Sequence, residues 1–226
     1  MIKDSLRALL SHFIKKSYAL NQLDLKLLPY INFRQGVFIE VGANDGITYS
    51  NTLYFEKYRG WRGLLIEAIP ALADKCLQNR PKCIVDNCAL VASDYKEKTI
   101  EMNYCNLMSL VKGGLNSAED ERKHIQNGKQ HLITGEETYI VSVPAKTLSQ
   151  VLNEHHIGHV DLLSLDVEGY EAQVLKGIDF VNHRIDFMLI EVRKAEDIEA
   201  AIGNLYKPIA ILNIDKSYSD ILYQRR

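Results

Sequence analysis

The stretch VFIEVGANDGITYSNT, Val37 to Thr52, decides the fold of this chain. Val37 to Val41 is an apolar run with one acid, Glu40, which is typical of a buried strand. The next five residues, GANDG, form a turn with a glycine at each end, and a helix is predicted from Thr48 to Tyr58. A buried strand, a glycine turn and a helix together predict a ligand site at the strand tip. A dinucleotide, a nucleotide, a phosphate and a methyl donor all remain candidate ligands at this point.

The same alternation continues along the chain. Further strands are predicted at Gly63–Ile66, Cys83–Val85, Tyr139–Val143, Val160–Leu165 and Ile185–Val192. Helices are predicted at Ala71–Asn79, Thr147–His155, Tyr170–Lys176 and Glu196–Gly203. The end of the chain, KPIAILNIDKSYSDILYQRR, reads as two strands joined by a polar turn. Strands that alternate with helices at this spacing indicate an α/β fold with a parallel sheet and helices on both faces.

Three segments depart from this alternation. Cys88–Ala92 and Thr99–Tyr104 both favour strand and are predicted to form a hairpin. Residues 106–137 are polar and glycine-containing, which predicts an insertion with a short helix, either a lid over a substrate or a solvated loop. Lys3–Leu20 has helical apolar spacing, which predicts a helix that either packs on the main domain or binds a membrane surface or a partner, such as a second copy in a homodimer. We therefore expect residues 1–226 to form one domain, with residues 1–30 as a helical extension.

Composition limits the class of protein. The chain has 226 residues, of which 46% are hydrophobic and 25% charged, as in ordinary soluble domains. A net charge of -2 gives no argument for binding nucleic acid or an anionic membrane. We find no secretory signal and no apolar run long enough for a membrane span. The four cysteines form no C-x-x-C pair, so zinc is not expected, and reduced thiols indicate a cytoplasmic location.

Polar side chains collect at the predicted carboxyl ends of the strands. They are Glu40, Asn44, Asp45, Glu67, Asp86, Asn87, Asp166, Glu168 and Glu191. In an open parallel sheet, ligands bind beyond these ends, near the point where strand order reverses. The predicted ligand site is therefore rich in carboxylates.

The chemistry of the first turn narrows the choice of ligand. A dinucleotide site needs G-x-G-x-x-G, but the middle glycine is missing here and Asp45 would repel a phosphate. No G-K-[ST] follows, which excludes a P-loop. Glu67, at the end of the second strand, can accept hydrogen bonds from both hydroxyls of a ribose. A ligand with a ribose, an amino-acid part and a positive centre fits these features, and S-adenosylmethionine is such a ligand.

Five segments carry a resemblance to a known family. They are FIEVGANDG, LLIEAIP, VDNCALV, VPAKTL and VDLLSLDVEGYEAQVLKG. Together they resemble the FkbM-type family of S-adenosylmethionine-dependent methyltransferases, from about Val37 to Ile190. The resemblance implies a Rossmann-like class I methyltransferase fold, with a mostly parallel seven-stranded sheet and an antiparallel last strand. It also implies O-methylation of a hydroxyl on a sugar or natural-product acceptor, with S-adenosylhomocysteine as product.

The resemblance also assigns donor-binding roles. For the methionine part, the backbone at Gly42 and Gly46 would approach closely, Glu40 would reach the ammonium, and Ser50 and Asn51 would bind the carboxylate. Glu67 would hold the ribose. The remaining predicted donor-site residues are Asn44 and Asp45, which line the turn, Asp86 and Asn87, which flank the adenine, and Asp166. The simpler interpretations are glycines that a turn requires, a surface acid at Glu67, and turn or capping roles for Asp86 and Asn87.

Asp166 and Glu168 are the predicted catalytic residues. Methyl transfer to an alcohol needs the hydroxyl proton to be removed, and Asp166 could act as the base or hold the acceptor. Asp166, Glu168 and Glu191 would also suit magnesium or calcium, but we assign no metal site. Asp166 and Glu168 could instead only cap the next helix. His124 and His131, in the insertion, are further candidates for the base.

Two other functions remain open. The first is a nucleotide-binding oxidoreductase on the same architecture, against which the missing glycine and Asp45 argue. The second is a non-catalytic module that binds S-adenosylmethionine, against which the complete set of acids argues. The sequence does not name the acceptor.

Overall fold

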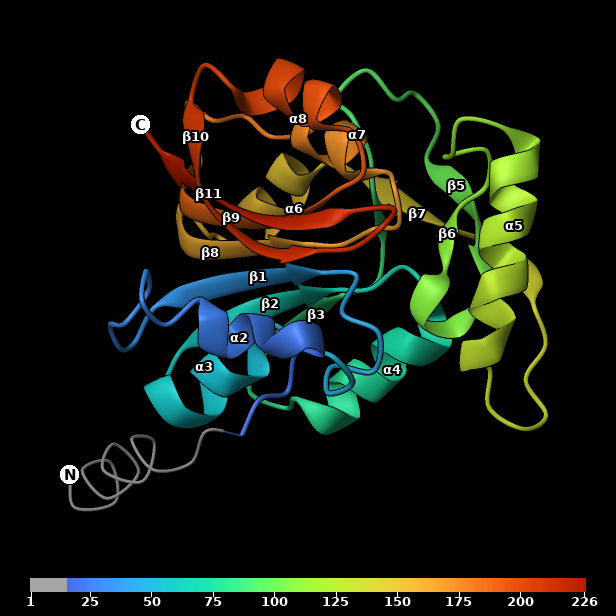
Figure 1. The fold of residues 1–226 in the computed structure, drawn as a ribbon, viewed down its shortest axis with the longest axis horizontal. Helices are drawn as coiled ribbons and strands as arrows, with labels where there is room; N and C mark the ends of the chain where they lie inside the picture. Colours follow the sequence, from blue (N-terminus) through green and yellow to red (C-terminus); the bar gives the residue numbers. More distant parts are fainter. Residues whose placement is uncertain (1–15) are drawn as a thin grey trace.

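The computed structural model describes residues 16–226, which are built around a seven-stranded sheet of order β10-β11-β9-β8-β1-β2-β3 (Figure 1). The strands are β1 (Val37–Val41), β2 (Arg62–Ile66), β3 (Ile84–Asp86), β8 (His159–Leu165), β9 (Arg184–Val192), β10 (Tyr206–Ile214) and β11 (Ser219–Arg225). Only β11 runs antiparallel to its neighbours in this sheet. The predicted α/β class, with a mostly parallel sheet and an antiparallel last strand, is confirmed.

Helices cover both faces of this sheet (Figure 1). One face carries α2 (Leu23–Lys26), α3 (Leu53–Arg59) and α4 (Pro70–Asn79), and the other carries α6 (Leu148–Glu154), α7 (Glu171–Leu175) and α8 (Ala195–Ile202). Neighbouring residues of one strand enter different cores. Phe38 packs in the α2 and α3 core, and Ile39 packs in the α6 core. Both faces of each central strand are buried, which explains its nearly continuous apolar sequence.

A second, smaller sheet corrects the predicted hairpin. Its order is β4 (Ala89–Leu90), β7 (Tyr139–Lys146), β5 (Thr99–Tyr104) and β6 (Leu110–Val111). The predicted pairing of Cys88–Ala92 with Thr99–Tyr104 is wrong, because β7 lies between these strands, parallel to β4 and antiparallel to β5. The distant strand β7 pairs with β4 and β5 in place of the predicted hairpin, because it adds apolar residues such as Val143 to the core that contains Val91 and Ile100. Local sequence does not reveal such a pairing.

The predicted insertion contains more structure than one helix. It holds η2 (Asn106–Met108), β6, α5 (Ala118–Gly128) and η3 (Lys129–His131). The Ser117 side chain accepts a hydrogen bond from Asp120 N and so caps α5. In Figure 1 this segment stands at one end of the molecule, beside the carboxyl ends of the central strands.

Most of the predicted helix over Lys3–Leu20 lies outside the described residues, which begin at residue 16. Its last residues are not α-helical, since Ala19 forms an isolated bridge with Tyr49 and a 3₁₀ turn, η1 (Leu20–Gln22), follows. The buried Asp24 carboxylate causes this by accepting hydrogen bonds from Ser17 Oγ and Tyr18 N.

Two expectations from composition can be compared with the fold. No helix within residues 16–226 has both the length and the apolar character that a membrane crossing requires. All four cysteines are free thiols, and three of them are buried.

Candidate functional site

The main cavity, of about 620 Å³, lies at the carboxyl ends of β1, β2, β8 and β9, where the insertion forms one wall. The predicted site residues that line it are Glu40, Gly42, Asn44, Ser50, Asn51, Glu67, Asp166 and Glu168. Because β1 lies at the reversal of strand order, the cavity is at the position expected for a ligand in this architecture.

Gly42 joins the tips of three strands. Its N–H donates to Ile66 O at 3.0 Å, and its φ of +79° lies in the left-handed region. A Cβ added here would lie 1.9 Å from the backbone oxygen of Asp166. The glycine is therefore required for Asp166 to approach the first turn.

Glu40 organises the segment after the turn. Its buried carboxylate accepts hydrogen bonds from Ser50 Oγ at 2.8 Å, Asn51 N at 2.7 Å and Thr52 Oγ1 at 2.7 Å. These bonds wrap residues 50–52 around the acid, so the predicted helix from Thr48 begins only at Leu53. The oxygens of Glu40 and the hydroxyl of Ser50 are thus engaged within the protein.

Asn51 leaves one polar atom unpaired. Its Nδ2 donates to Ser164 Oγ at 3.0 Å, while its Oδ1 is buried without a hydrogen-bond partner. A buried acceptor without a partner costs about 1–3 kcal/mol. A ligand N–H group in the cavity would relieve that cost.

Glu67 lies between the first turn and β2. Its Oε2 accepts from Asn44 N at 2.8 Å, and its Oε1 accepts from Ile69 N at 2.8 Å. A carboxylate offers about four acceptor positions, so each oxygen keeps capacity for a further donor. Burial raises the pKa of Glu67 to about 7, against the effect of the backbone hydrogen bonds.

Four predicted donor-site residues do not line the cavity: Asp45, Gly46, Asp86 and Asn87. The carboxylate of Asp45 accepts hydrogen bonds from the backbone of Ile47 and Thr48 and shapes the turn. Gly46, also at a φ of +79°, packs its backbone near the Arg80 side chain.

Asp86 and Asn87 are held inside the protein. Asp86 binds Lys146 Nζ at 3.1 Å and His155 Nε2 at 3.0 Å. Asn87 Nδ2 donates to Glu67 O at 2.7 Å and so orients the backbone beside the predicted ribose site. The structure does not bring these two side chains into the cavity.

A cluster of acids surrounds one cation at the tips of β8 and β9. Arg193 Nη2 lies 2.6 Å from Glu168 Oε2 and 2.8 Å from Glu191 Oε1. Glu171 Oε1 accepts from Gly169 N at 3.0 Å, and the Asp166 side chain is exposed to the cavity. Oxygens of Asp166, Glu171 and Glu191 lie within 4.8 Å of one another, but this spacing alone defines no metal site because Arg193 supplies the adjacent positive charge.

Sequence reasoning missed Glu171 and Arg193. Both have a signal that was available: Glu171 stands inside the DVEGYEAQ segment, and Arg193 follows the strand that ends in Glu191. His124, from α5, is also buried here, with Nε2 at 3.4 Å from Glu168 Oε2 and 3.1 Å from Met108 O. The insertion thus contributes a titratable group to the cluster, whereas His131 lines the cavity outside it.

Burial and mutual repulsion hold protons on this cluster. Burial, and then the charge of Asp166, raises the pKa of Glu168 to about 8 and that of Glu191 to about 10. Burial also raises the pKa of Glu171 to about 6. Partial loss of water around Asp166 in the cavity raises the pKa of that carboxyl, although Arg193 opposes this shift. One arginine does not compensate four carboxylates.

We expect the free energy of unfolding of the ligand-free protein to fall as pH rises from 7 to 8.5. In this window folded Glu168 and Glu191 hold protons that the unfolded chain has already lost, so rising pH favours the unfolded state. The expected slope is on the order of 1 kcal/mol per pH unit. Urea unfolding at several pH values measures it, and the slope should flatten in Glu191→Gln. A wild-type stability that rises across this window would contradict the predicted proton occupancy.

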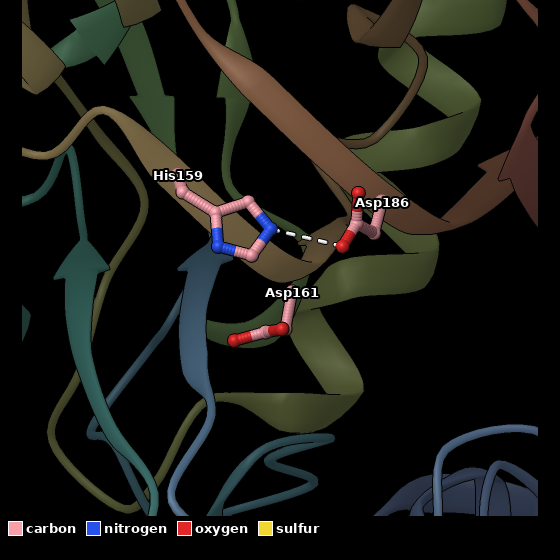
Figure 2. A group of neighbouring side chains, drawn as sticks. All are labelled: His159, Asp161 and Asp186. Atoms are coloured by element: carbon pink, nitrogen blue, oxygen red, sulfur yellow. Dashed lines mark hydrogen bonds and ion pairs between the residues drawn. The ribbon is translucent and has the colours of Figure 1, made fainter.

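A second group of titratable side chains lies at the opposite end of the sheet, where β8 and β9 begin. Figure 2 shows His159 beside Asp186, with Nε2 and Oδ2 2.9 Å apart, and Asp161 next to them. Asp161 Oδ2 accepts a hydrogen bond from Val37 N at 2.7 Å, and Asp186 Oδ1 accepts one from Arg184 Nε at 2.7 Å. All three side chains therefore have hydrogen-bond partners within the protein, and we assign no metal site here.

Comparison with known proteins identifies the family of this chain. Residues 40–218 match the methyltransferase FkbM domain. The chain belongs to the methyltransferase FkbM family. No curated protein matches its sequence.

Several solved structures are similar to this FkbM-family chain at low sequence identity. The methyltransferase FkbM from Methylobacillus flagellatus KT is 13% identical, with a TM-score of 0.50, and the match covers 95% of this chain and 49% of that one. A human methyltransferase 10 domain containing protein is 12% identical, with a TM-score of 0.47 and coverages of 90% and 81%. A fibrillarin from Aeropyrum pernix in complex with S-adenosyl-L-methionine is 13% identical, with a TM-score of 0.43 and coverages of 84% and 67%.

The cavity of this FkbM-family methyltransferase fits a cationic methyl donor. Asn51 Oδ1 offers an unpaired acceptor, and Glu67 keeps acceptor capacity. The carboxylates outnumber the adjacent arginine. These groups suit a ligand that carries N–H donors, hydroxyls and positive charge.

Proposed function

We propose that the protein is an S-adenosylmethionine-dependent O-methyltransferase that acts on a hydroxyl of a sugar or natural product. The observation that carries this proposal is the arrangement of Glu67, Asn51 and Asp166 around one cavity. This arrangement supports a site in which Glu67 would bind a ribose, Asn51 an ammonium group, and Asp166 would act as a base. Membership of the methyltransferase FkbM family supports the type of reaction.

Three side chains of this protein have assigned roles in the donor site. Glu67 accepts hydrogen bonds from the ribose hydroxyls through the capacity that Asn44 N and Ile69 N leave on its oxygens. Asn51 Oδ1 accepts from the ammonium group. Glu40 acts indirectly, since it fixes the segment that carries Asn51.

Asp166 and Glu168 serve the acceptor side. The bound donor supplies an electrophilic methyl group: its carbon–sulfur bond breaks as the carbon–oxygen bond forms, and the electron pair stays on sulfur. Asp166 faces the cavity and orients the acceptor hydroxyl there, and its carboxylate receives the hydroxyl proton. The insertion lines the cavity next to these acids, through His124 among others, and selects the acceptor.

The first test is calorimetric binding of S-adenosylmethionine, S-adenosylhomocysteine and NAD. We expect micromolar binding of the two sulfur compounds and none of NAD. Glu67→Ala should weaken the binding of both sulfur compounds about 10–100-fold, because the substitution removes hydrogen bonds to a charged acceptor. Asp186→Asn, at the far end of β9, is the control and should bind as the wild type does.

The other outcomes separate the alternatives. Tighter binding of NAD than of S-adenosylmethionine would favour the oxidoreductase. Donor binding without product across a broad screen of sugar and natural-product hydroxyls would favour the non-catalytic module. Wild-type affinity in Glu67→Ala would show that Glu67 is only a structural acid.

We also infer that the chain acts as one domain in the cytoplasm. Its four free cysteines suit a reducing compartment. A homodimer contact through the N-terminal segment is a further proposal, which sedimentation of the full chain and of a variant lacking residues 1–15 would test.

A further inference from the structure

The cluster around Arg193 has an excess of negative groups that the protein does not balance. Acids face it from the end of β8, from α7, from β9 and from β11. Within residues 16–226, the basic groups that contact these acids are Arg193 and the buried His124, and Lys26 acts on Asp220 at longer range. The titratable groups are Glu40, His124, Asp166, Glu168, Glu171, Glu191, Arg193, Tyr218 and Asp220. Glu40 has its own cation, since Arg80 Nη1 lies 3.5 Å from it.

His124 does not supply the missing charge. Burial and the neighbouring Arg193 lower the pKa of its imidazole, so it is neutral at physiological pH. Tyr218 is also neutral, because burial and the nearby acids raise its pKa to about 12. The cluster therefore balances its charge either by holding protons or by accepting a cation in the cavity.

Its geometry leaves room for that cation. Arg193 bridges Glu168 and Glu191 on one side, while the Asp166 carboxylate faces the cavity. Glu191 is buried, and its Oε1 contacts Arg193 without forming a hydrogen bond. The cavity space next to Asp166 is thus bordered by carboxylates whose charge the protein only partly satisfies.

We propose that this carboxyl cluster exchanges a proton for the positive charge of the methyl donor, with Glu191 and Glu168 as the proton-holding groups. Entry of the sulfonium into the cavity expels one proton from the cluster. When the methyl group has left, sulfur is a neutral thioether, and the cluster takes up a proton, which is the one that the acceptor hydroxyl loses. In balance, the acceptor oxygen gains the methyl group from sulfur and gives its proton to the cluster, and no other reactant is needed. This inference rests on the proposed function.

The proposal gives Glu191 a role beyond structure. Loss of the sulfonium charge during the reaction makes the carboxylates stronger bases at the moment when the acceptor oxygen must lose its proton. Asp166, which faces the cavity, passes that proton to the cluster.

The test compares proton exchange on binding and needs no acceptor. Titrations of S-adenosylmethionine and S-adenosylhomocysteine are run at pH 6.5 in two buffers of different ionisation enthalpy, which gives the number of protons released. The α-amino group of either ligand is largely protonated at this pH, since such groups have pKa values of about 7.7–8.0. We expect S-adenosylmethionine to release about one proton more than S-adenosylhomocysteine.

Variants locate the proton. Glu191→Gln preserves shape but removes one titrating group, and the difference between the two ligands should shrink by about half or more. Asp186→Asn neutralises an acid of the same strand far from the cavity and should keep the full difference. If Glu191→Gln does not fold, the wild-type comparison still decides the proposal.

Equal proton release by the two ligands in the wild type would overturn the proposal while leaving the proposed function standing. An unchanged difference in Glu191→Gln would overturn the role of Glu191. Failure of both ligands to bind would instead overturn the proposed function, and this inference with it.

Discussion

Asp166→Asn is expected to lower kcat for methyl transfer about 10²–10⁴-fold, the usual contribution of a positioned base. Asparagine keeps the shape of the side chain that faces the cavity but cannot accept the hydroxyl proton. The neutral product S-adenosylhomocysteine should bind the variant nearly as well as the wild type, because the proposed ribose and ammonium contacts at Glu67 and Asn51 do not involve Asp166. Product formation at saturating donor and acceptor, together with calorimetric binding of S-adenosylhomocysteine, measures both effects.

The control for Asp166→Asn is again Asp186→Asn, which removes the same charge at the opposite end of the sheet. It should retain wild-type turnover. Full activity of Asp166→Asn would rule out Asp166 as base and as proton carrier. Loss of product binding in Asp166→Asn would instead show that the substitution disturbs the fold of the cavity.

Gly42→Ala is expected to lower the free energy of unfolding by about 3 kcal/mol or more. A left-handed φ costs a residue with a Cβ roughly 1–2 kcal/mol. At Gly42 the new methyl group would also meet the Asp166 backbone oxygen at 1.9 Å, so the tips of β1 and β8 must move apart. Urea or thermal unfolding measures the loss.

Gly60 provides a matched control, because its φ of +68° is similar but no atom lies within 4 Å of an added Cβ. Gly60→Ala should lose only the conformational cost of roughly 1–2 kcal/mol. The difference between the two variants isolates the contact between the first turn and Asp166. Equal losses would mean that the backbone at Asp166 relaxes freely.

Periodic apolar patterning predicted the central sheet correctly. The runs at Val37–Val41 and Val160–Leu165 are buried on both faces, so their sequences alone are diagnostic. The β4 and β5 pairing was missed because strand partners depend on which distant segment completes the core, here β7. The start of α3 was missed because Glu40, ten or more residues upstream, binds the hydroxyls and amide that precede it.

Site prediction from strand tips found several residues that line the cavity, but it also included four that do not, and it did not reveal how each is used. Asp86 follows a strand as Glu67 does, yet Lys146 and His155 hold it inside the protein. Arg193 and His124 come from segments distant in sequence from Glu168, and only the folded chain brings them together. The polar groups at a strand tip can thus be predicted from the sequence, whereas their ion-pair partners require the tertiary structure.

The pairing of β5 with β7 has a consequence for how this chain can vary. Tyr104 and Tyr139 are direct partners in the pairing of β5 with β7, and their ring centroids stack 4.6 Å apart. The segment between them therefore leaves the smaller sheet and returns to it at the same place. The entropy of closing such a loop grows only with the logarithm of its length, by about 0.6 kcal/mol per doubling. A change in the length of the part of residues 105–138 that is not packed in a core therefore adds only a small loop-closure cost. Under the proposed function, new acceptor walls could evolve here while the proposed donor site stays unchanged.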